Sequence, residues 1–254
     1  MMNRTEVIKR SFRKNLDTYD AHATAQNIIS NVLHDIIINH YQKKPRSILE
    51  IGCGTGFLTR NIINSYIPQH YYLNDLNEQV TELLAKYIKD CPHTFLIGDA
   101  QTIEMPFNID LVISASTLQW FNNPQNIFKK IANLLSDEGY FFFSTFGSQN
   151  LQEIKQLTSQ GLEYLQCTEL KTILEDDFEI FFVFEEIISL TFNSPINILK
   201  HLKYTGVTGP FSTIWTKAKL DRFVENYATL WQDESRSFPL TYHPIYFGMR
   251  KRKI

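Results

Sequence analysis

Residues 46–57 read RSILEIGCGTGF, a short apolar run that stops at Glu50 and gives way to glycines at positions 52, 54 and 56. This order predicts a strand, a tight loop and the start of a helix. Glycine has no Cβ and tolerates positive φ, so alternate glycines let the backbone come close to a ligand. The spacing G-x-G-x-G differs from the G-x-G-x-x-G of dinucleotide sites and favours a smaller nucleoside ligand. The alternative is that the glycines only form a tight turn between strand and helix.

Four more short apolar runs follow the glycine loop, and each ends in polar residues. They cover residues 71–73, 93–97, 109–114 and 140–144. The first of them ends at Asn74 and Asp75, about twenty residues after the loop, where an α/β nucleotide site places an acid for the ribose hydroxyls. The repetition predicts an α/β fold whose ligand lies beyond the carboxyl ends of parallel strands.

Together, EIGCGTG at 50–56, Asp75, GDA at 98–100 and ISAS at 113–116 resemble the class I S-adenosylmethionine-dependent methyltransferases over residues 46–146. The resemblance implies a Rossmann-like, mixed but mostly parallel seven-stranded sheet with helices on both faces. It also implies S-adenosyl-L-methionine as co-substrate and no metal. The residues that it assigns to this cofactor are Glu50 at the methionine ammonium, Gly52, Gly54 and Gly56 at the methionine and ribose, Asp75 at the ribose hydroxyls, Asp99 at the adenine amino group and Ala100 at the ring, with Cys53, Leu76 and Ser114 as further binding candidates.

Residues 1–45 precede the cofactor-binding core and predict two helices, the second carrying an apolar stripe at helical spacing from Ile28 to Ile37. The segment between them, residues 12–26, is rich in polar and aromatic side chains. Tyr19 is either a half-buried packing residue or part of a lid over the methyl donor. Related methyltransferases have a similar Tyr-Asp segment followed seven residues later by Gln, which implies that Tyr19 and Gln26 close the cofactor pocket.

Residues 147–254 hold the remaining strands, and a helical insertion is predicted between the last two. The insertion includes a helix over 196–203, a glycine loop over 204–212 and a helix over about 217–232, and a single final strand follows. We expect the insertion and the N-terminal helices to form a lid within one structural domain. On the core side, STLQWFNN at 116–123 lies where a methyl acceptor would approach, with Gln119 a pocket candidate and Trp120 more typical of a core.

A narrower resemblance extends over nearly the whole chain. TYDAHA at 18–23, QWF at 119–121, FSTFGSQNLQEI from 143, LKYTGVTG from 202 and FPLTYH from 238 resemble the malonyl-acyl carrier protein O-methyltransferases of biotin synthesis. This implies methyl transfer to the free carboxylate of malonyl on the phosphopantetheine of acyl carrier protein, or on coenzyme A, giving the ester that primes pimeloyl synthesis. The substrate-pocket candidates are Tyr19, Gln119, Trp120, Lys200, Lys203, Tyr242 and His243. Lys200 stands where the family often has Arg, and a point charge grips a carboxylate less well than a planar fork.

The predicted reaction needs no general base, because a carboxyl group with a pKa of about 3–4 is already ionised at neutral pH. We interpret His243 as a hydrogen-bonded structural histidine and His201, between two lysines, as solvated. Carrier protein could dock on Lys200, Lys203, Lys217, Lys219 and Arg222. Two rival interpretations are a methyltransferase of the same fold acting on another small carboxylic acid or a quinone precursor, and a cofactor-binding regulator without turnover.

Composition limits the classes of partner and the cellular compartment that the chain suits. The 254 residues carry a formal net charge of −2, which disfavours a dedicated nucleic-acid binder. Three cysteines, at 53, 91 and 167, lack metal-ligand spacing, and reduced thiols are the simplest explanation for them. The N-terminus has no signal-peptide core and no run is long enough to span a membrane. We therefore expect a cytoplasmic protein, acting as a monomer, with no nucleic-acid or membrane partner.

Overall fold

The computed structural model describes residues 4–159, 161–207 and 215–253. These residues group into two compact units. The first, here the insertion unit, comprises residues 1–25, 147–164 and 186–244. The second, here the sheet unit, comprises residues 26–146, 165–185 and 245–254, and contains all of the predicted segment 46–146. The predicted segment 147–254 is shared between the two.

The sheet unit is built on seven strands in the order β3-β2-β1-β4-β5-β9-β6. The strands from β3 to β5 pair in parallel, and β6 runs antiparallel to β9. This confirms the mixed, mostly parallel sheet, whose strands are β1 Ser47–Ile51, β2 His70–Asp75, β3 His93–Ile97, β4 Ile109–Ala115, β5 Leu135–Phe146, β6 Phe178–Glu185 and β9 Pro244–Lys251.

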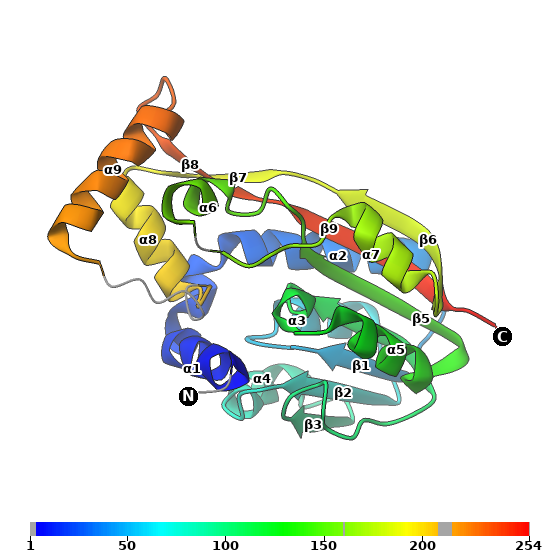
Figure 1. The fold of residues 1–254 in the computed structure, drawn as a ribbon. Helices are drawn as coiled ribbons and strands as arrows, with labels where there is room; N and C mark the ends of the chain where they lie inside the picture. The colour runs from blue at the N-terminus through cyan, green and yellow to red at the C-terminus, as the bar shows by residue number, and fades with distance from the viewer. Residues whose placement is uncertain (1–3, 160, 208–214, 254) are drawn as a thin grey trace. The chain divides into compact units, whose positions relative to one another are not determined.

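Helices cover both faces of this sheet, α5 and α7 on one and α2 on the other (Figure 1). Successive aromatic residues of β5 point to opposite faces of the sheet. The ring of Phe143 lies 5.6 Å from Phe128 of α5, whereas the ring of Phe142 lies 5.7 Å from Phe181 of β6, on the other face. Both faces of β5 are therefore buried, as expected for a central strand. The helices of this unit are α2 Thr24–His40, α3 Phe57–Ser65, α4 Val80–Ile88, the 3₁₀ turn η1 Leu118–Trp120, α5 Pro124–Leu134 and α7 Cys167–Leu174.

Local sequence signals explain where α5 begins. The side chain of Asn123 accepts a hydrogen bond from the Asn126 amide at 3.1 Å, and Pro124 occupies the first helical position, where a missing N–H costs nothing. Ile127 and Ile131 then fall on one buried face. That face packs into the main apolar core of the sheet unit.

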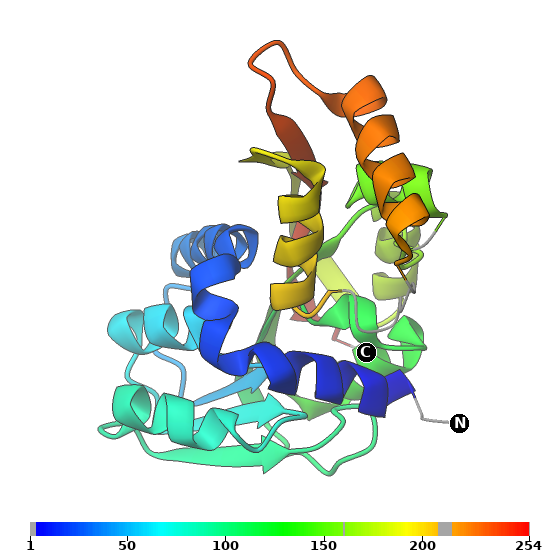
Figure 2. The ribbon, with the colours of Figure 1, turned by 90° about the vertical axis from the view of Figure 1, so that its left-hand side faces the viewer.

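The insertion unit consists of helices around a two-stranded antiparallel ribbon, β7 with β8. Helix α8 lies next to α9, and α1 lies at the carboxyl end of α8 (Figure 2). Two side chains of α1 fasten that end: the Ser11 hydroxyl donates to the Gly206 carbonyl at 3.0 Å and the Asn15 amide donates to the Lys203 carbonyl at 2.8 Å. The elements are α1 Arg4–His22, α6 Gln152–Thr158, β7 Ile188–Phe192, α8 Pro195–Tyr204, α9 Lys217–Trp231 and β8 Phe238–Tyr242.

Two details differ from the sequence predictions. The single final strand is two strands, because Pro244 has no N–H to give and the His243 amide donates to the Asn150 side chain at 3.2 Å instead of to a ladder. Residues 12–22 continue α1, so the predicted inter-helix segment shrinks to Ala23. Of the predicted glycine loop, residues 208–212 lie outside the described residues.

Among the described residues, no helix combines the length and the apolar character needed to cross a bilayer.

Candidate cofactor and substrate sites

The glycine loop leaves β1 with positive φ at each glycine, 74° at Gly52, 51° at Gly54 and 86° at Gly56. The outer two are fixed by packing: a Cβ would lie 2.2 Å from the Thr117 side chain at Gly52 and 2.2 Å from Leu84 at Gly56. At Gly54 a Cβ would meet nothing within 4 Å. The backbone of Gly54 therefore borders open space, where a ligand can approach it.

The carboxylate of Asp75, at the end of β2, organises this loop. It accepts the amide of Gly54 at 2.9 Å on one oxygen and the amide of Asn77 at 2.8 Å on the other. The amides of Gly52 and Cys53 both donate to the carbonyl of Asn74, each at 2.9 Å. The end of β2 thus holds the loop in place and presents the Asp75 carboxylate beside Gly54.

Glu50 is a buried carboxyl group beneath the loop, only 1% exposed. Its Oε2 atom accepts the hydroxyl of Tyr71 at 2.6 Å and that of Thr59 at 2.8 Å. Burial raises the pKa of Glu50 to about 7, against the lowering effect of these two hydrogen bonds. The charge of Asp75 adds to the rise. A cationic ligand group close to Glu50 would favour its ionised form.

Several buried polar atoms of the sheet unit lack a hydrogen-bond partner among the described residues. They are Gln26 Oε1, Thr55 Oγ1, Asn77 Oδ1, Ser116 Oγ and Gln119 Oε1. Thr55, Asn77 and the Ser116–Gln119 pair follow β1, β2 and β4, at the carboxyl edge of the sheet. Leaving a buried polar group unsatisfied costs about 1–3 kcal/mol. Their concentration at one edge indicates a site that receives hydrogen-bonding groups from a ligand.

S-adenosylmethionine fits this set of groups. Its ammonium, ribose hydroxyls and adenine amino group are donors, and the unsatisfied atoms are oxygens able to accept. Glu50 and Asp75 add two carboxyl groups at the same edge, and the open side of Gly54 leaves room for close backbone contact. The residues present therefore suit the cofactor that the resemblance implies. Within the described part of the chain, no cluster of three His, Cys, Asp or Glu side chains could hold a metal ion.

The loop after β3 carries Asp99 and Ala100, and a lysine of α5 hydrogen-bonds to its backbone. The amide of Gln101 donates to Asp99 Oδ1 at 2.9 Å. Lys130 Nζ donates to the carbonyls of Ala100 at 2.8 Å and of Ile103 at 2.6 Å, and burial lowers the pKa of this lysine. Sequence reasoning did not single out Lys130, although it fixes the backbone on which the predicted adenine contacts stand.

The other predicted cofactor residues lie at the same edge in different roles. Ser114 is fully buried, and its hydroxyl donates to the Ile51 carbonyl at 2.8 Å, which joins β4 to β1. Cys53 is buried within the loop, and burial raises the pKa of its thiol. Leu76 is half-buried after β2.

Two of the substrate candidates also belong to the sheet unit. Gln119 and Trp120 form part of η1, and the side-chain amide of Gln119 donates to the Ser116 carbonyl at 2.6 Å.

The remaining substrate candidates lie in the insertion unit. Tyr19 is on α1, with its ring 6.1 Å from that of Phe12, and Lys200 and Lys203 are exposed on α8. Tyr242 ends β8 and is 1% exposed. His243 is also buried, and its Nδ1 accepts the Gln149 amide at 3.2 Å, as a hydrogen-bonded structural histidine would.

The expectation that His201 is solvated is wrong. This side chain is 6% exposed, and its Nε2 lies 2.7 Å from the Tyr242 hydroxyl. Burial, with the nearby His22, lowers the pKa of His201 to about 4. The flanking lysines suggested solvent, but Ile198, Leu202 and Thr205 share its helical spacing and are all buried. That stripe was the signal for a buried position.

Comparison with known proteins gives a consistent result. A family described as "Methyltransferase domain" matches residues 49–143. A Bacteroides thetaiotaomicron protein named malonyl-acyl-carrier-protein O-methyltransferase is 36% identical over the full length of both chains. One of the same name from Bacteroides fragilis is 40% identical over 97% of this chain, which spans half of that longer protein.

The chain belongs to the malonyl-acyl-carrier-protein O-methyltransferase family.

Solved structures share the fold of this methyltransferase family member at much lower identity. The N-methyltransferase NodS from Bradyrhizobium japonicum, solved in complex with S-adenosyl-L-homocysteine, superposes with a TM-score of 0.59 at 11% identity, covering 97% of this chain and 99% of that one. This likeness supports the class I methyltransferase fold.

For a member of the malonyl-acyl-carrier-protein O-methyltransferase family, the residues that sequence reasoning missed are informative. Thr55, Asn77 and Ser116 each carry an unsatisfied buried oxygen. Each stands one to four residues beyond a strand end. Thr55 and Ser116 lie inside stretches that the sequence already marked, but nothing in the sequence distinguished their side chains from their neighbours. Their side-chain environment depends on loops that meet only in the folded sheet.

Proposed function

We propose that this chain transfers a methyl group from S-adenosylmethionine to the free carboxylate of a malonyl group carried on acyl carrier protein. The product is the malonyl methyl ester, and we assign it to the priming of pimeloyl synthesis for biotin. The substrate comes from the names of relatives that match almost the whole chain, including one aligned over its full length. The observation that carries the cofactor assignment is the row of unsatisfied buried oxygens at the carboxyl edge of the sheet.

When bound, S-adenosylmethionine supplies an electrophilic methyl group on a positively charged sulfur. The chain contributes acceptors that suit the donors of this molecule: Glu50 for the ammonium, Asp75 for the ribose and Asp99 for the adenine. Because burial raises the pKa of Glu50 to about 7, a nearby positive charge would stabilise its ionised form, which favours cationic ligands over neutral ones. Gly54 allows close backbone approach without a side chain in the way.

Methyl transfer to malonyl requires positioning rather than proton transfer. The acceptor carboxyl is ionised at neutral pH, so no general base is needed. The charges of carboxylate and sulfonium cancel as the methyl group moves, and an enclosed site that excludes water favours such a step. Aligning the acceptor oxygen with the methyl carbon can itself supply several kcal/mol. Tyr19, Gln119, Trp120, Lys200, Lys203, Tyr242 and His243 remain our substrate-side candidates.

The test is incubation of the purified chain with methyl-labelled S-adenosylmethionine and malonyl-acyl carrier protein. Label on the malonyl carboxylate is expected, and base-labile release as methanol identifies the ester. Label on other small carboxylic acids but not on malonyl would replace the substrate assignment. Calorimetric binding of S-adenosyl-L-homocysteine without transfer to any acceptor would indicate a regulator and refute the enzyme.

A genetic test separates the pathway from the chemistry. A biotin-requiring bacterial strain without this methyltransferase should grow when it carries the native chain. The Asp75→Ala variant loses the carboxylate that accepts the Gly54 and Asn77 amides, and it should fail to restore growth. Equal growth with both chains would contradict the cofactor assignment.

A further inference from the structure

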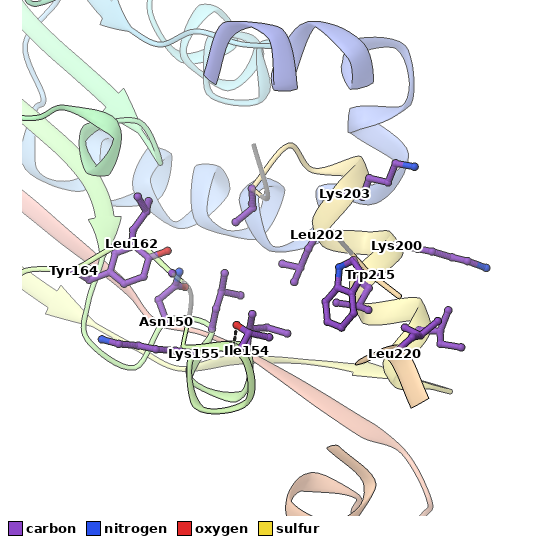
Figure 3. A pocket seen from close by; sticks show the side chains of 16 residues that line it. Asn150, Ile154, Lys155, Leu162, Tyr164, Lys200, Leu202, Lys203, Trp215 and Leu220 are labelled. Carbon is purple, nitrogen blue, oxygen red and sulfur yellow. Dashed lines mark hydrogen bonds between the residues drawn. The ribbon is translucent and has the colours of Figure 1, made fainter. Parts of the chain in front are cut away.

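A cavity of about 560 Å³ lies entirely within the insertion unit (Figure 3). It is bordered by α6 with its flanking loops on one side and by α8 and the start of α9 on the other. Ile154, Leu199, Leu202 and Leu220 give it a mainly apolar wall. Its volume falls in the range of about 300–1,000 Å³ that small-molecule sites occupy. None of the sheet-unit residues assigned to the cofactor lines it.

Polar groups stand at one part of this wall. Asn150 and Tyr164 hydrogen-bond to each other, and Asn150 Oδ1 also accepts the His243 amide at 3.2 Å. Burial raises the pKa of Tyr164 to about 12, so this phenol stays protonated at neutral pH. The cavity therefore presents an amide and a phenol next to an otherwise apolar surface.

Positive charge surrounds the cavity. Lys155, Lys200 and Lys203 are among its lining residues, and all three are exposed. Figure 3 shows the side chains of Lys200 and Lys203 extending outward from α8, so their alkyl stems border the cavity while their ammonium ends reach solvent. An occupant with an apolar body and an anionic end complements this arrangement.

We propose that this cavity holds the phosphopantetheine arm of the carrier protein, with the phosphate at Lys200 and Lys203. The inference rests on the proposed function, because it concerns the same substrate. The arm has a branched apolar segment, two amides and one phosphate, which match the apolar wall, the Asn150–Tyr164 end and the lysines in turn. The malonyl carboxylate is excluded as occupant of the apolar wall, since burying a charge there is costly.

The indole of Trp215 provides a direct readout. It lines the cavity, is 38% exposed and contacts the Phe223 ring edge-on at 5.2 Å. Titrating the full chain with 4′-phosphopantetheine should change its tryptophan emission, and the change should disappear in Trp215→Phe. A response that survives in Trp215→Phe, or no response at millimolar ligand, would overturn the proposal.

A comparison of ligands and variants isolates the role of the lysines. Because exposed charge pairs contribute only modestly to binding, Lys200→Gln with Lys203→Gln should weaken 4′-phosphopantetheine binding roughly five- to twentyfold. The same double variant should bind pantetheine, which lacks the phosphate, as the native chain does. Lys14→Gln, on the exposed surface of α1, is the matched control and should change neither affinity. Equal losses for the two ligands would refute the phosphate assignment.

The inference and the proposed function fail in different ways. Leu199→Glu places a negative charge in the apolar wall and should raise KM for malonyl-acyl carrier protein about tenfold, while calorimetric binding of S-adenosyl-L-homocysteine stays native and shows that the sheet unit is intact. If 4′-phosphopantetheine binds in a Trp215-dependent way but no methyl transfer occurs, the assignment of the arm to the cavity is supported and the proposed function is refuted. Methyl transfer with a KM unchanged by Leu199→Glu would sink the cavity assignment alone.

Discussion

Replacing Glu50 with Gln should make the ligand-free protein more stable at neutral pH and weaken its binding of the cofactor. The glutamine amide oxygen can still accept from Tyr71 and Thr59, so the substitution chiefly removes a charge. Raising the pKa of Glu50 from 4.5 to about 7 corresponds to about 3 kcal/mol that disfavours the ionised carboxylate in the folded state. That is the largest gain that the variant can show.

The sign of this effect with pH follows from which state releases its proton first. The unfolded chain loses the Glu50 proton near pH 4.5, whereas the folded chain keeps it up to about pH 7. As pH rises through this window the folded state binds more protons, so native stability falls. The variant lacks this loss. Its advantage over the native chain should be near zero below about pH 4.5 and approach about 3 kcal/mol above about pH 7.

The assay is the free energy of unfolding from urea titrations of both chains at several pH values, taken as a difference so that other titrating groups cancel. Glu82→Gln, at an exposed position on α4, is the control and should stay within about 0.5 kcal/mol of the native chain. Calorimetry with S-adenosyl-L-homocysteine should show weaker binding to Glu50→Gln. A stability difference that does not change with pH would refute the argument from burial.

Three further substitutions test other parts of the structure. Gly54→Ala places a methyl group in open space at φ 51°, so it should lower the free energy of unfolding by only about 1–2 kcal/mol. Calorimetry should show that the variant has largely lost its binding of S-adenosyl-L-homocysteine. Tyr242→Phe removes the partner 2.7 Å from His201 Nε2 and should lower the urea unfolding free energy by about 1 kcal/mol. Asn123→Ala removes the cap on the Asn126 amide and should cost about 1 kcal/mol in the same assay, whereas Asn123→Asp should retain most of it.

The sheet unit could be predicted from the sequence because its signals are local. The run before Gly52, the acid at Asp75 and the GDA at 98–100 each mark a strand end within a few residues, and parallel strands bring such ends to one edge. The start of α5 is also marked locally, because Asn123 and Pro124 are short-range helix-start signals.

The insertion unit was less predictable because its contacts join distant segments. The break at His243 depends on Asn150, 93 residues earlier, and the hydrogen-bond partner of His201 is Tyr242, 41 residues later. No window of sequence contains either pair. The apolar character of 238–247 is continuous, so only the pairing of β8 with β7 and of β9 with β6 reveals two strands.

The strand order of the large sheet has a consequence for biosynthesis. β9, the last strand of the chain, lies between β5 and β6, both of which are made much earlier. Until residues 244–251 leave the ribosome, those two strands have an open backbone edge that can pair with another chain. We therefore expect nascent or truncated forms lacking β9 to aggregate and to depend on chaperones, although they already contain the entire glycine loop.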